Sequence, residues 1–301
     1  MTDHYDSHRA YQQRLGLTSA LMAFSLWGFA PLYFKLLEDV LALEIIAHRI
    51  IWSVVILGVV LGLRHRVSVF THLKVPYQTL LALSISGAII GLNWLIFVYA
   101  VNSDRVLSTS LGYFINPLVS VALGMVFFKE HLNGLQVLAV ALAAAGTLYL
   151  TVQVGDFPWI ALTLAFSFGL YGLIRKQLDV GPMVGLFWET LIVLPLAGLW
   201  LFWRGTQGLL TAEFDGFSDG LLMVGTGAIT VMPLLLFAAG VRRLNLSTIG
   251  ILQYIAPSLS FCMAVFLFKE PFSADHAITF GCIWSGLLLY TYSSWVNRPR
   301  V

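Results

Sequence analysis

The stretch SLGYFINPLVSVALGMVFFKE, residues 110–130, occurs a second time as GILQYIAPSLSFCMAVFLFKE, residues 250–270. The two copies align without a gap at a shift of 140: Pro117 falls on Pro257, and both copies end in Phe-Lys-Glu. Each copy is apolar over about 20 residues, the length that a helix needs to cross a bilayer. The sequence therefore predicts a duplicated membrane protein in which this helix marks each half.

The overall composition supports the membrane class. Of the 301 residues, 58% are hydrophobic and 11% are charged, and the mean hydropathy is +0.85. Soluble domains have about 45–50% apolar and about 25% charged residues. The basic residues are scattered singly or in pairs, which argues against nucleic acid as a partner. Cys262 and Cys282 both lie in apolar runs and suggest neither a disulfide framework nor a metal site.

Apolar windows of membrane-spanning length divide the whole chain into ten predicted helices. The first window is too long for the core of a signal peptide. The loops between windows are short and leave no room for a soluble domain. We predict a tail over 1–14, two five-helix repeats over 15–152 and 157–296, and a tail over 297–301. The windows run approximately 15–37, 42–63, 77–100, 106–128, 134–152, 157–177, 182–203, 219–241, 246–268 and 275–296.

The distribution of lysine and arginine predicts the orientation of the chain. With the N-terminus in the cytoplasm, twelve of the 17 basic residues fall on the cytoplasmic side, four fall on the other side and Arg49 lies inside a span. An excess on that side is the usual pattern. Because each half has five helices, an odd number, the second half enters the membrane from the opposite side. The sequence thus predicts an inverted repeat, a common plan of secondary transporters, with both termini cytoplasmic.

Several motifs together resemble the drug/metabolite transporter superfamily with two EamA-type repeats and, within it, the RarD family of permeases. The resemblance covers the chain from about residue 15 to 296, and SLGYFINPL is its most specific run. It implies a ten-helix inner-membrane permease for small organic solutes, a class that includes drugs such as chloramphenicol, with which members are often linked. The motifs are Trp27-Gly28 with 31–35, Glu44 with His48-Arg49, Asn93-Trp94, 110–117, Tyr171 with Arg175-Lys176, and 253–257.

The two central prolines predict a substrate site near the midplane. Proline has no N–H, so the carbonyls of Tyr113 and Gln253, four residues earlier, lose their helical partners. Free carbonyls at that depth need protein, water or ligand as partners. Tyr113 and Asn116 in one copy, and Gln253 and Tyr254 in the other, place further hydrogen-bonding groups there. The alternative is a pair of structural kinks that neighbouring helices satisfy.

Three further residues are candidates for the wall of this site. Asn93 aligns with Pro233 at the shift of 140, so both helices are irregular at similar depth. Asn93 either lines the cavity or joins two helices, as polar residues often do in membranes. Trp94 and Trp27 lie deep in their windows and are candidates to stack on an aromatic or amphipathic solute.

Charged residues inside spans are costly and point to function. Arg49 and Glu189 each lie about two turns into a window, and they align with each other at the shift of 140. We predict that they either form an ion pair during the transport cycle or act separately. Glu189 is then a proton-coupling group or a structural hydrogen-bonding group, and Arg49 pairs with Glu44 or extends to the surface. His48 titrates near neutral pH and is a second coupling candidate.

The remaining basic residues lie at helix ends. Lys35 is on the side with few basic residues, where it is a candidate cationic gate for anionic solutes. The other members of this group are interpreted as topology anchors on the cytoplasmic side: Arg175, Lys176, Arg242 and Arg243.

Catalytic, nucleotide-binding and metal motifs are absent from the sequence. We therefore predict a non-enzymatic secondary transporter without cofactor or metal. It would carry a small-molecule substrate through the bilayer, with or without coupled protons. Three alternatives stay open: an uncoupled facilitator or exchanger, an intramembrane enzyme, and a scaffold subunit. The enzyme would need a reactive constellation that is not readable, and the scaffold would not need polar groups at the midplane.

Overall fold

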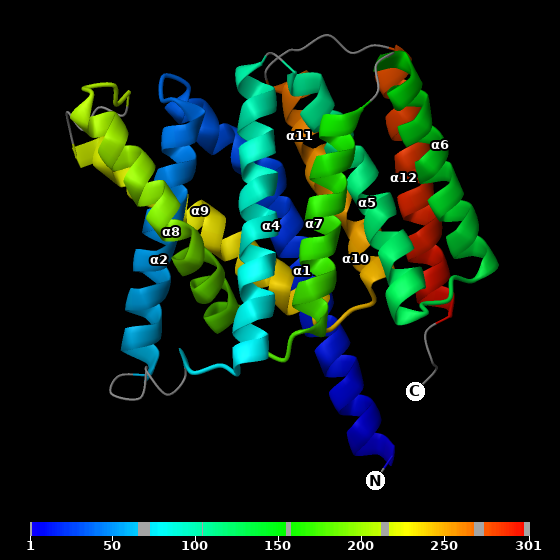
Figure 1. Ribbon diagram of the computed structural model, residues 1–301. Helices are drawn as coiled ribbons and strands as arrows, with labels where there is room; N and C mark the ends of the chain where they lie inside the picture. Colours follow the sequence, from blue (N-terminus) through cyan, green and yellow to red (C-terminus); the bar gives the residue numbers. More distant parts are fainter. Residues whose placement is uncertain are drawn as a thin grey trace.

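Long helices lie side by side through the whole molecule, which we describe from a computed structural model (Figure 1). The structure describes residues 2–65, 73–103, 105–154, 158–211, 217–267 and 274–297. The first half contains α1 (Thr2–Phe34), the 3-10 helix η1 (Lys35–Leu37), α2 (Ala42–His65), α4 (Tyr77–Asn102), α5 (Val106–Phe128) and α6 (Gly134–Val154). The second contains α7 (Trp159–Gln177), α8 (Pro182–Thr206), α9 (Phe217–Val241), α10 (Leu246–Gln253), α11 (Ile255–Phe266) and α12 (Ala274–Val296).

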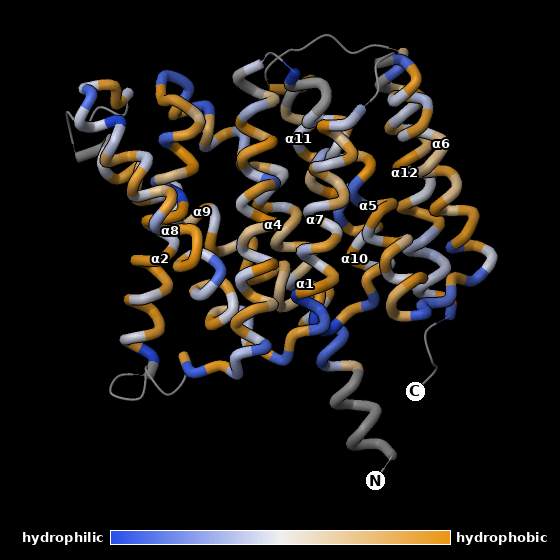
Figure 2. Tube along the Cα trace, in the orientation of Figure 1, coloured by the Kyte–Doolittle hydropathy of each residue, from blue (hydrophilic) through white to orange (hydrophobic). Residues whose placement is uncertain are grey.

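These helices confirm the predicted all-α membrane fold. Eight of them are long and apolar enough to cross a membrane by length and composition. The other two predicted spans, α7 and α12, pack along spanning helices: α7 lies against α4 and α5, and α12 lies against α6. Hydrophilic segments gather at the two ends of the helices, while their middle parts are mostly hydrophobic (Figure 2).

Helix packing follows the duplication of the sequence. We match α1, α2, α4, α5 and α6 in order to α7, α8, α9, α10–α11 and α12. Contacts between two helices can then be compared with contacts between their counterparts. The α5–α7 contact corresponds to the α11–α1 contact. In the same way, α1–α9 corresponds to α7–α4, and α2–α9 corresponds to α8–α4. Three further contacts, α6–α12, α5–α10 and α2–α8, map onto themselves. The halves are therefore related by an approximate two-fold axis.

The direction of the helices agrees with an inverted repeat. In Figure 1, α5 runs downward whereas its counterpart α10–α11 runs upward. The start of α1 and the end of α12 lie at the bottom of the same view. We call this the terminal side of the molecule and the other the distal side.

The two copies of the opening stretch differ at their prolines. α5 continues without interruption through Pro117. In the second copy, α10 ends at Gln253 and α11 begins at Ile255, so the helix is interrupted three residues before Pro257. The expected loss of one hydrogen bond to the Tyr113 carbonyl thus leaves α5 continuous, whereas the second copy is interrupted. A missing proline N–H removes one helical hydrogen bond, and neighbouring helices can support such a site in a membrane.

α5 and α10 approach each other closely next to the two-fold axis. A Cβ atom at Gly250 would lie 2.6 Å from the carbonyl oxygen of Pro117. A larger side chain would therefore push the two helices apart. The marker helices of the two halves are in this way held backbone to backbone at the centre of the molecule.

Polar contacts tie the helix ends together on the terminal side. Glu130, which follows α5, accepts hydrogen bonds from the backbone N–H groups of Leu246 (2.7 Å) and Ser247 (2.8 Å) at the start of α10. Lys176 donates to the carbonyl of Val241 (3.2 Å) at the end of α9. Lys176 is therefore a helix-capping residue, in addition to any role in setting the orientation.

Candidate functional site

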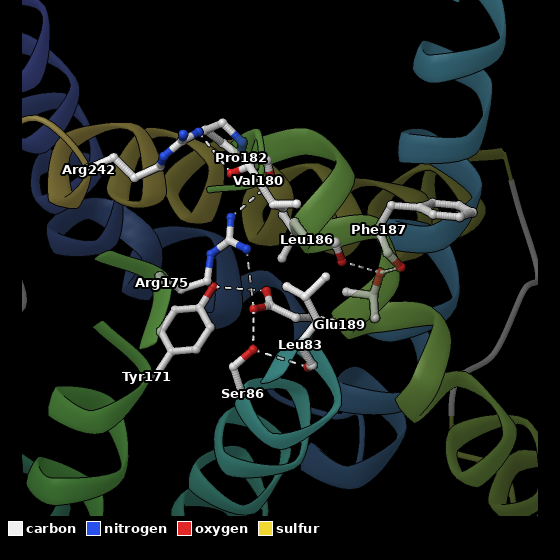
Figure 3. A network of polar contacts seen from close by, with 11 residues as sticks. Leu83, Ser86, Tyr171, Arg175, Val180, Pro182, Leu186, Phe187, Glu189 and Arg242 are labelled. Carbon is white, nitrogen blue, oxygen red and sulfur yellow. Dashed lines mark hydrogen bonds and ion pairs between the residues drawn. The ribbon is translucent and has the colours of Figure 1, made fainter. Parts of the chain in front are cut away.

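Glu189 is at the centre of a buried polar cluster on the terminal side (Figure 3). Its Oε1 accepts a hydrogen bond from Ser86 of α4 (2.6 Å), and its Oε2 accepts one from the Tyr171 hydroxyl of α7 (3.2 Å). The Arg175 guanidinium lies 3.6 Å from Oε1 and forms an ion pair with it. None of these four side chains is more than 1% exposed. Three helices are thus joined by one carboxylate, and we call these four residues the Glu189 cluster.

Arg175 does not lie at the surface, so its interpretation as a topology anchor is wrong. It is buried because Glu189 supplies the opposite charge, and Pro182 accepts a hydrogen bond from its Nη2 (3.4 Å). Gly185, one turn before Glu189 on α8, provides the space, since a Cβ atom there would overlap the guanidinium. Tyr171 and Arg175 are four residues apart and share a face of α7, which is a sequence signal for this cluster.

Arg242 and Arg243 are tied to their neighbours at the terminal surface. Arg242 forms an ion pair with Asp179 (3.0 Å) and donates to the Val180 carbonyl (2.8 Å). Arg243 donates to the Gln12 side chain (2.9 Å).

Arg49 is the centre of a second polar site, nearer the distal side. Its Nε donates to the hydroxyl of Thr230 on α9 (2.8 Å). Its guanidinium carbon lies 5.1 Å from the centre of the Trp94 ring and 5.5 Å from that of Phe34. Tyr113 of α5 is within electrostatic range of the guanidinium. We call these five residues the Arg49 site.

Arg49 and Glu189 do not pair with each other in this structure, which matches the alternative that they act separately. Glu189 pairs with Arg175, and Arg49 bonds to Thr230. The two residues occupy equivalent places, since Glu189 of α8 contacts α4 and Arg49 of α2 contacts α9. In an inverted repeat, equivalent positions lie at equal depth from opposite membrane surfaces. Two residues that align with each other are therefore far apart in space unless both lie near the midplane.

The predicted midplane residues do not all face one place. Tyr113 is 50% exposed, and its ring centre lies 6.4 Å from that of Phe97. Asn116, one turn further along α5, is buried, and its Oδ1 has no hydrogen-bond partner in the described part of the chain. Gln253 is also buried and bonds to Ser120 of α5 (3.1 Å).

Tyr254 belongs to a separate apolar core. It is fully buried, and its hydroxyl donates to the Phe114 carbonyl (3.1 Å). It packs with Phe114, Phe280 and Ile283, which come from α5 and α12. The expectation that Tyr254 faces Tyr113 and Asn116 across a shared site is therefore not met. The interruption of the helix at Tyr254 turns its side chain into this core.

Asn93 and Trp94 are neighbours that contact different parts of the molecule. Asn93 donates to the Leu164 carbonyl (2.9 Å) and to the Ser167 hydroxyl (2.8 Å), which joins α4 to α7. Trp94 instead faces Arg49. The contacts of Asn93 match the alternative in which it links two helices.

The other candidates lie around these two sites. Trp27 packs on Phe168 and Phe237 with ring centres 5.7 Å apart in both cases, and the stack of Phe237 on Tyr171 continues toward the Glu189 cluster. His48 is partly buried next to Arg49 on α2. Lys35 is exposed at the start of η1.

Comparison with known proteins gives a consistent result. The model of the EamA-like transporter family matches the chain twice, over residues 14–152 and 158–292. The Bacillus subtilis (strain 168) protein "Uncharacterized transporter YojE" is 44% identical over 94% of this chain and 95% of its own length. "Protein RarD" of Escherichia coli (strain K12) is 42% identical over 97% of this chain and 98% of its own length.

Two further similarities are more distant. "Chloramphenicol-sensitive protein RarD" of Pseudomonas aeruginosa is 32% identical over 93% of this chain and 94% of its own length. A solved structure described as "Crystal structure of protein" has a TM-score of 0.73 and covers 97% of this chain and 100% of that chain. Its sequence identity is 19%, so it shows the fold alone.

Proposed function

Because the chain belongs to the EamA-like transporter family, and within it to the RarD-type permeases of the drug/metabolite transporter superfamily, we propose that it is a secondary permease for small organic solutes. The solute binds between the two halves and reaches either side of the membrane in turn. The excess of lysine and arginine on the terminal side supports a cytoplasmic location for both termini in the inner membrane.

The observation that carries this proposal is the unequal burial of two equivalent sites. The Glu189 cluster is sealed, with every member at 1% exposure or less. At the Arg49 site, Tyr113 is half exposed and Arg49 is partly exposed. A guanidinium is unfavourable against lipid, which supports a solute pathway beside these two residues. When inverted halves exchange their conformations, the open and the sealed side exchange as well.

Glu189 is the proposed gate on the terminal side. Its ion pair with Arg175 and its bonds to Ser86 and Tyr171 join α8, α7 and α4. Opening that side requires these contacts to separate. Protonation of Glu189 would weaken the pair with Arg175, which gives a route for coupling to a proton gradient. An uncoupled facilitator would open the same gate without a change in charge.

Reconstituted protein tests both parts of the proposal. Liposomes with the protein should take up a labelled solute faster than protein-free liposomes, and chloramphenicol belongs in the first panel because one relative is named for sensitivity to it. Glu189→Gln should remove any stimulation by a pH gradient, and Asp179→Asn, which changes an exposed carboxylate on the same side, should not. If uptake responds equally to pH in wild type and in Glu189→Gln, Glu189 takes no part in coupling transport to protons.

A further inference from the structure

Among the described residues, Arg49 is a partly exposed charge without an acidic partner, unlike the buried charges of the bundle. Arg175 pairs with Glu189 (3.6 Å), and Glu44 pairs with Arg204 (3.6 Å). In the part of the chain that the structure describes, no carboxylate pairs with Arg49. A charge inside a membrane protein is costly unless an opposite charge or water compensates it. Compensation for Arg49 must therefore come from water or from an anion outside the described protein.

The guanidinium of Arg49 is held in one orientation and retains free donors. Nε is used by Thr230, whose own hydroxyl donates to the Thr226 carbonyl (2.7 Å) and is thereby fixed. Within the described residues, the terminal nitrogens Nη1 and Nη2 donate no hydrogen bond. A planar pair of free N–H donors matches the two oxygens of a carboxylate.

The surroundings of these donors are aromatic. Trp94 and Phe34 contact the guanidinium, and Phe97 packs beside Tyr113. Tyr113 exposes half of its surface although it lies two turns inside α5. Aromatic side chains of this kind bind aromatic or apolar groups through their faces and edges. The Tyr113 hydroxyl adds one more hydrogen-bonding group near the guanidinium.

We propose that Arg49 recognises a carboxylate of the transported solute, and that Trp94, Phe97 and Tyr113 hold its aromatic or apolar body. This inference rests on the proposed transport function and specifies the class of substrate as organic monoanions. The equivalent place in the other half cannot bind an anion in the same way, because it carries Glu189 with its own cation. The two ends of the pathway thus have different chemistry although the helices are equivalent.

A matched ligand series tests the charge requirement. Purified protein is titrated with 3-phenylpropionate, its amide and 3-phenylpropylamine, and binding is measured by thermal shift and by competition with labelled 3-phenylpropionate. The carboxylate should bind at least about tenfold more tightly than the amide, a ratio that corresponds to about 1.4 kcal/mol. Arg49→Gln should abolish this preference, and Arg49→Lys should keep part of it. Arg242→Gln, which removes a guanidinium at the terminal surface, should bind like wild type.

A measurement on the unchanged protein guards against misfolded variants. Phenylglyoxal modifies arginine side chains, and the modified peptides are followed by mass spectrometry. 3-Phenylpropionate should slow the modification of Arg49 several-fold, whereas its amide should not. Equal modification rates with and without the carboxylate would overturn the proposal, as would equal binding of carboxylate and amide.

Transport assays separate this inference from the function on which it rests. One outcome would refute the anion site and leave the permease function intact. In it, the wild type takes up neutral or cationic solutes but not the carboxylate, and Arg49→Gln takes up the same solutes equally well. If a panel of anionic, neutral and cationic solutes shows no protein-dependent uptake, the transport proposal itself fails. Uptake of 3-phenylpropionate that is lost in Arg49→Gln but kept in Arg242→Gln would support both.

Discussion

Among single residues, Glu189 and Arg175 show how a charge is retained inside the helix bundle. Each is about 1% exposed, and each compensates the other's charge. Loss of one partner of such a pair typically costs about 3–5 kcal/mol, because the other charge remains buried. Replacement of both by apolar side chains of similar size is often neutral.

We therefore expect Glu189→Gln to lower the thermal unfolding temperature of the purified protein clearly, by an amount that corresponds to a few kcal/mol. The double variant Arg175→Met, Glu189→Leu should recover much of this loss. Its transport should nevertheless be impaired, because the gate contacts are gone. Asp179→Asn provides the control, since the Asp179 side chain is exposed and its ion pair with Arg242 contributes little. A double variant less stable than either single variant would contradict the charge-balance explanation.

Asn116 allows stability and transport to be separated at one residue. Its buried Oδ1 has no partner within the described structure, so the fold gains little from it. An apolar group of the same size removes an unsatisfied acceptor, which is neutral or stabilising for the fold. Asn116→Leu should thus unfold at the same or a higher temperature than wild type, yet take up solute more slowly if the amide serves the pathway. Reduced stability together with normal uptake would show that Asn116 is a structural residue.

The sequence identified two of the charges inside the spans but not how they pair. Glu189 and Arg49 were recognisable because a charge in an apolar window is rare. The partner of Glu189 could not be assigned from sequence, since pairing depends on the rotation of α7 and α8 about their axes. Arg175 lies near the end of its window, where basic residues are usually exposed. The glycine at position 185, which makes room for the guanidinium, has meaning only once the two helices are placed.

At the level of helices, apolar length and the repeat predicted most of the fold. α2 begins at Ala42, α4 at Tyr77, α5 at Val106 and α8 at Pro182, as the windows predicted. The length of an apolar run is set by the bilayer and can be read locally. The interruption at Tyr254 was not predicted, because Pro117 and Pro257 have similar neighbours in sequence and differ in their tertiary contacts.

The crossing of α5 and α10 gives a prediction at this level. Alanine in place of glycine inside a helix normally stabilises it by about 1 kcal/mol. At Gly250 the added methyl group would lie 2.6 Å from the Pro117 carbonyl, so Gly250→Ala should instead lower the unfolding temperature. Gly198→Ala in α8 is the matched control, because nothing lies within 4 Å of its added Cβ, and it should unfold at the same or a slightly higher temperature. Equal unfolding temperatures of the two variants would argue against a tight crossing.

For the whole molecule, the proposed alternating access together with the approximate two-fold symmetry predicts two related conformations. The Glu189 cluster on the terminal side is sealed, and the Arg49 site nearer the distal side is partly exposed. In a Cys262→Ser, Cys282→Ser background, the thiol of the Tyr113→Cys variant should react with a membrane-impermeant reagent added from the distal side. The thiol of the Ser86→Cys variant should be protected, because Ser86 is fully buried.

The proposed exchange between the two conformations predicts how the reactivity of these two thiols changes when the gate contacts of Glu189 are weakened. Glu189→Gln weakens the contacts that seal the terminal side and shifts the population toward the state open on that side. The Tyr113→Cys thiol should then react more slowly from the distal side, while the Ser86→Cys thiol becomes reactive from the terminal side. The two rates should change in opposite directions, because one motion opens one side as it closes the other. A parallel rise of both would instead indicate a loosened bundle or an uncoupled open channel.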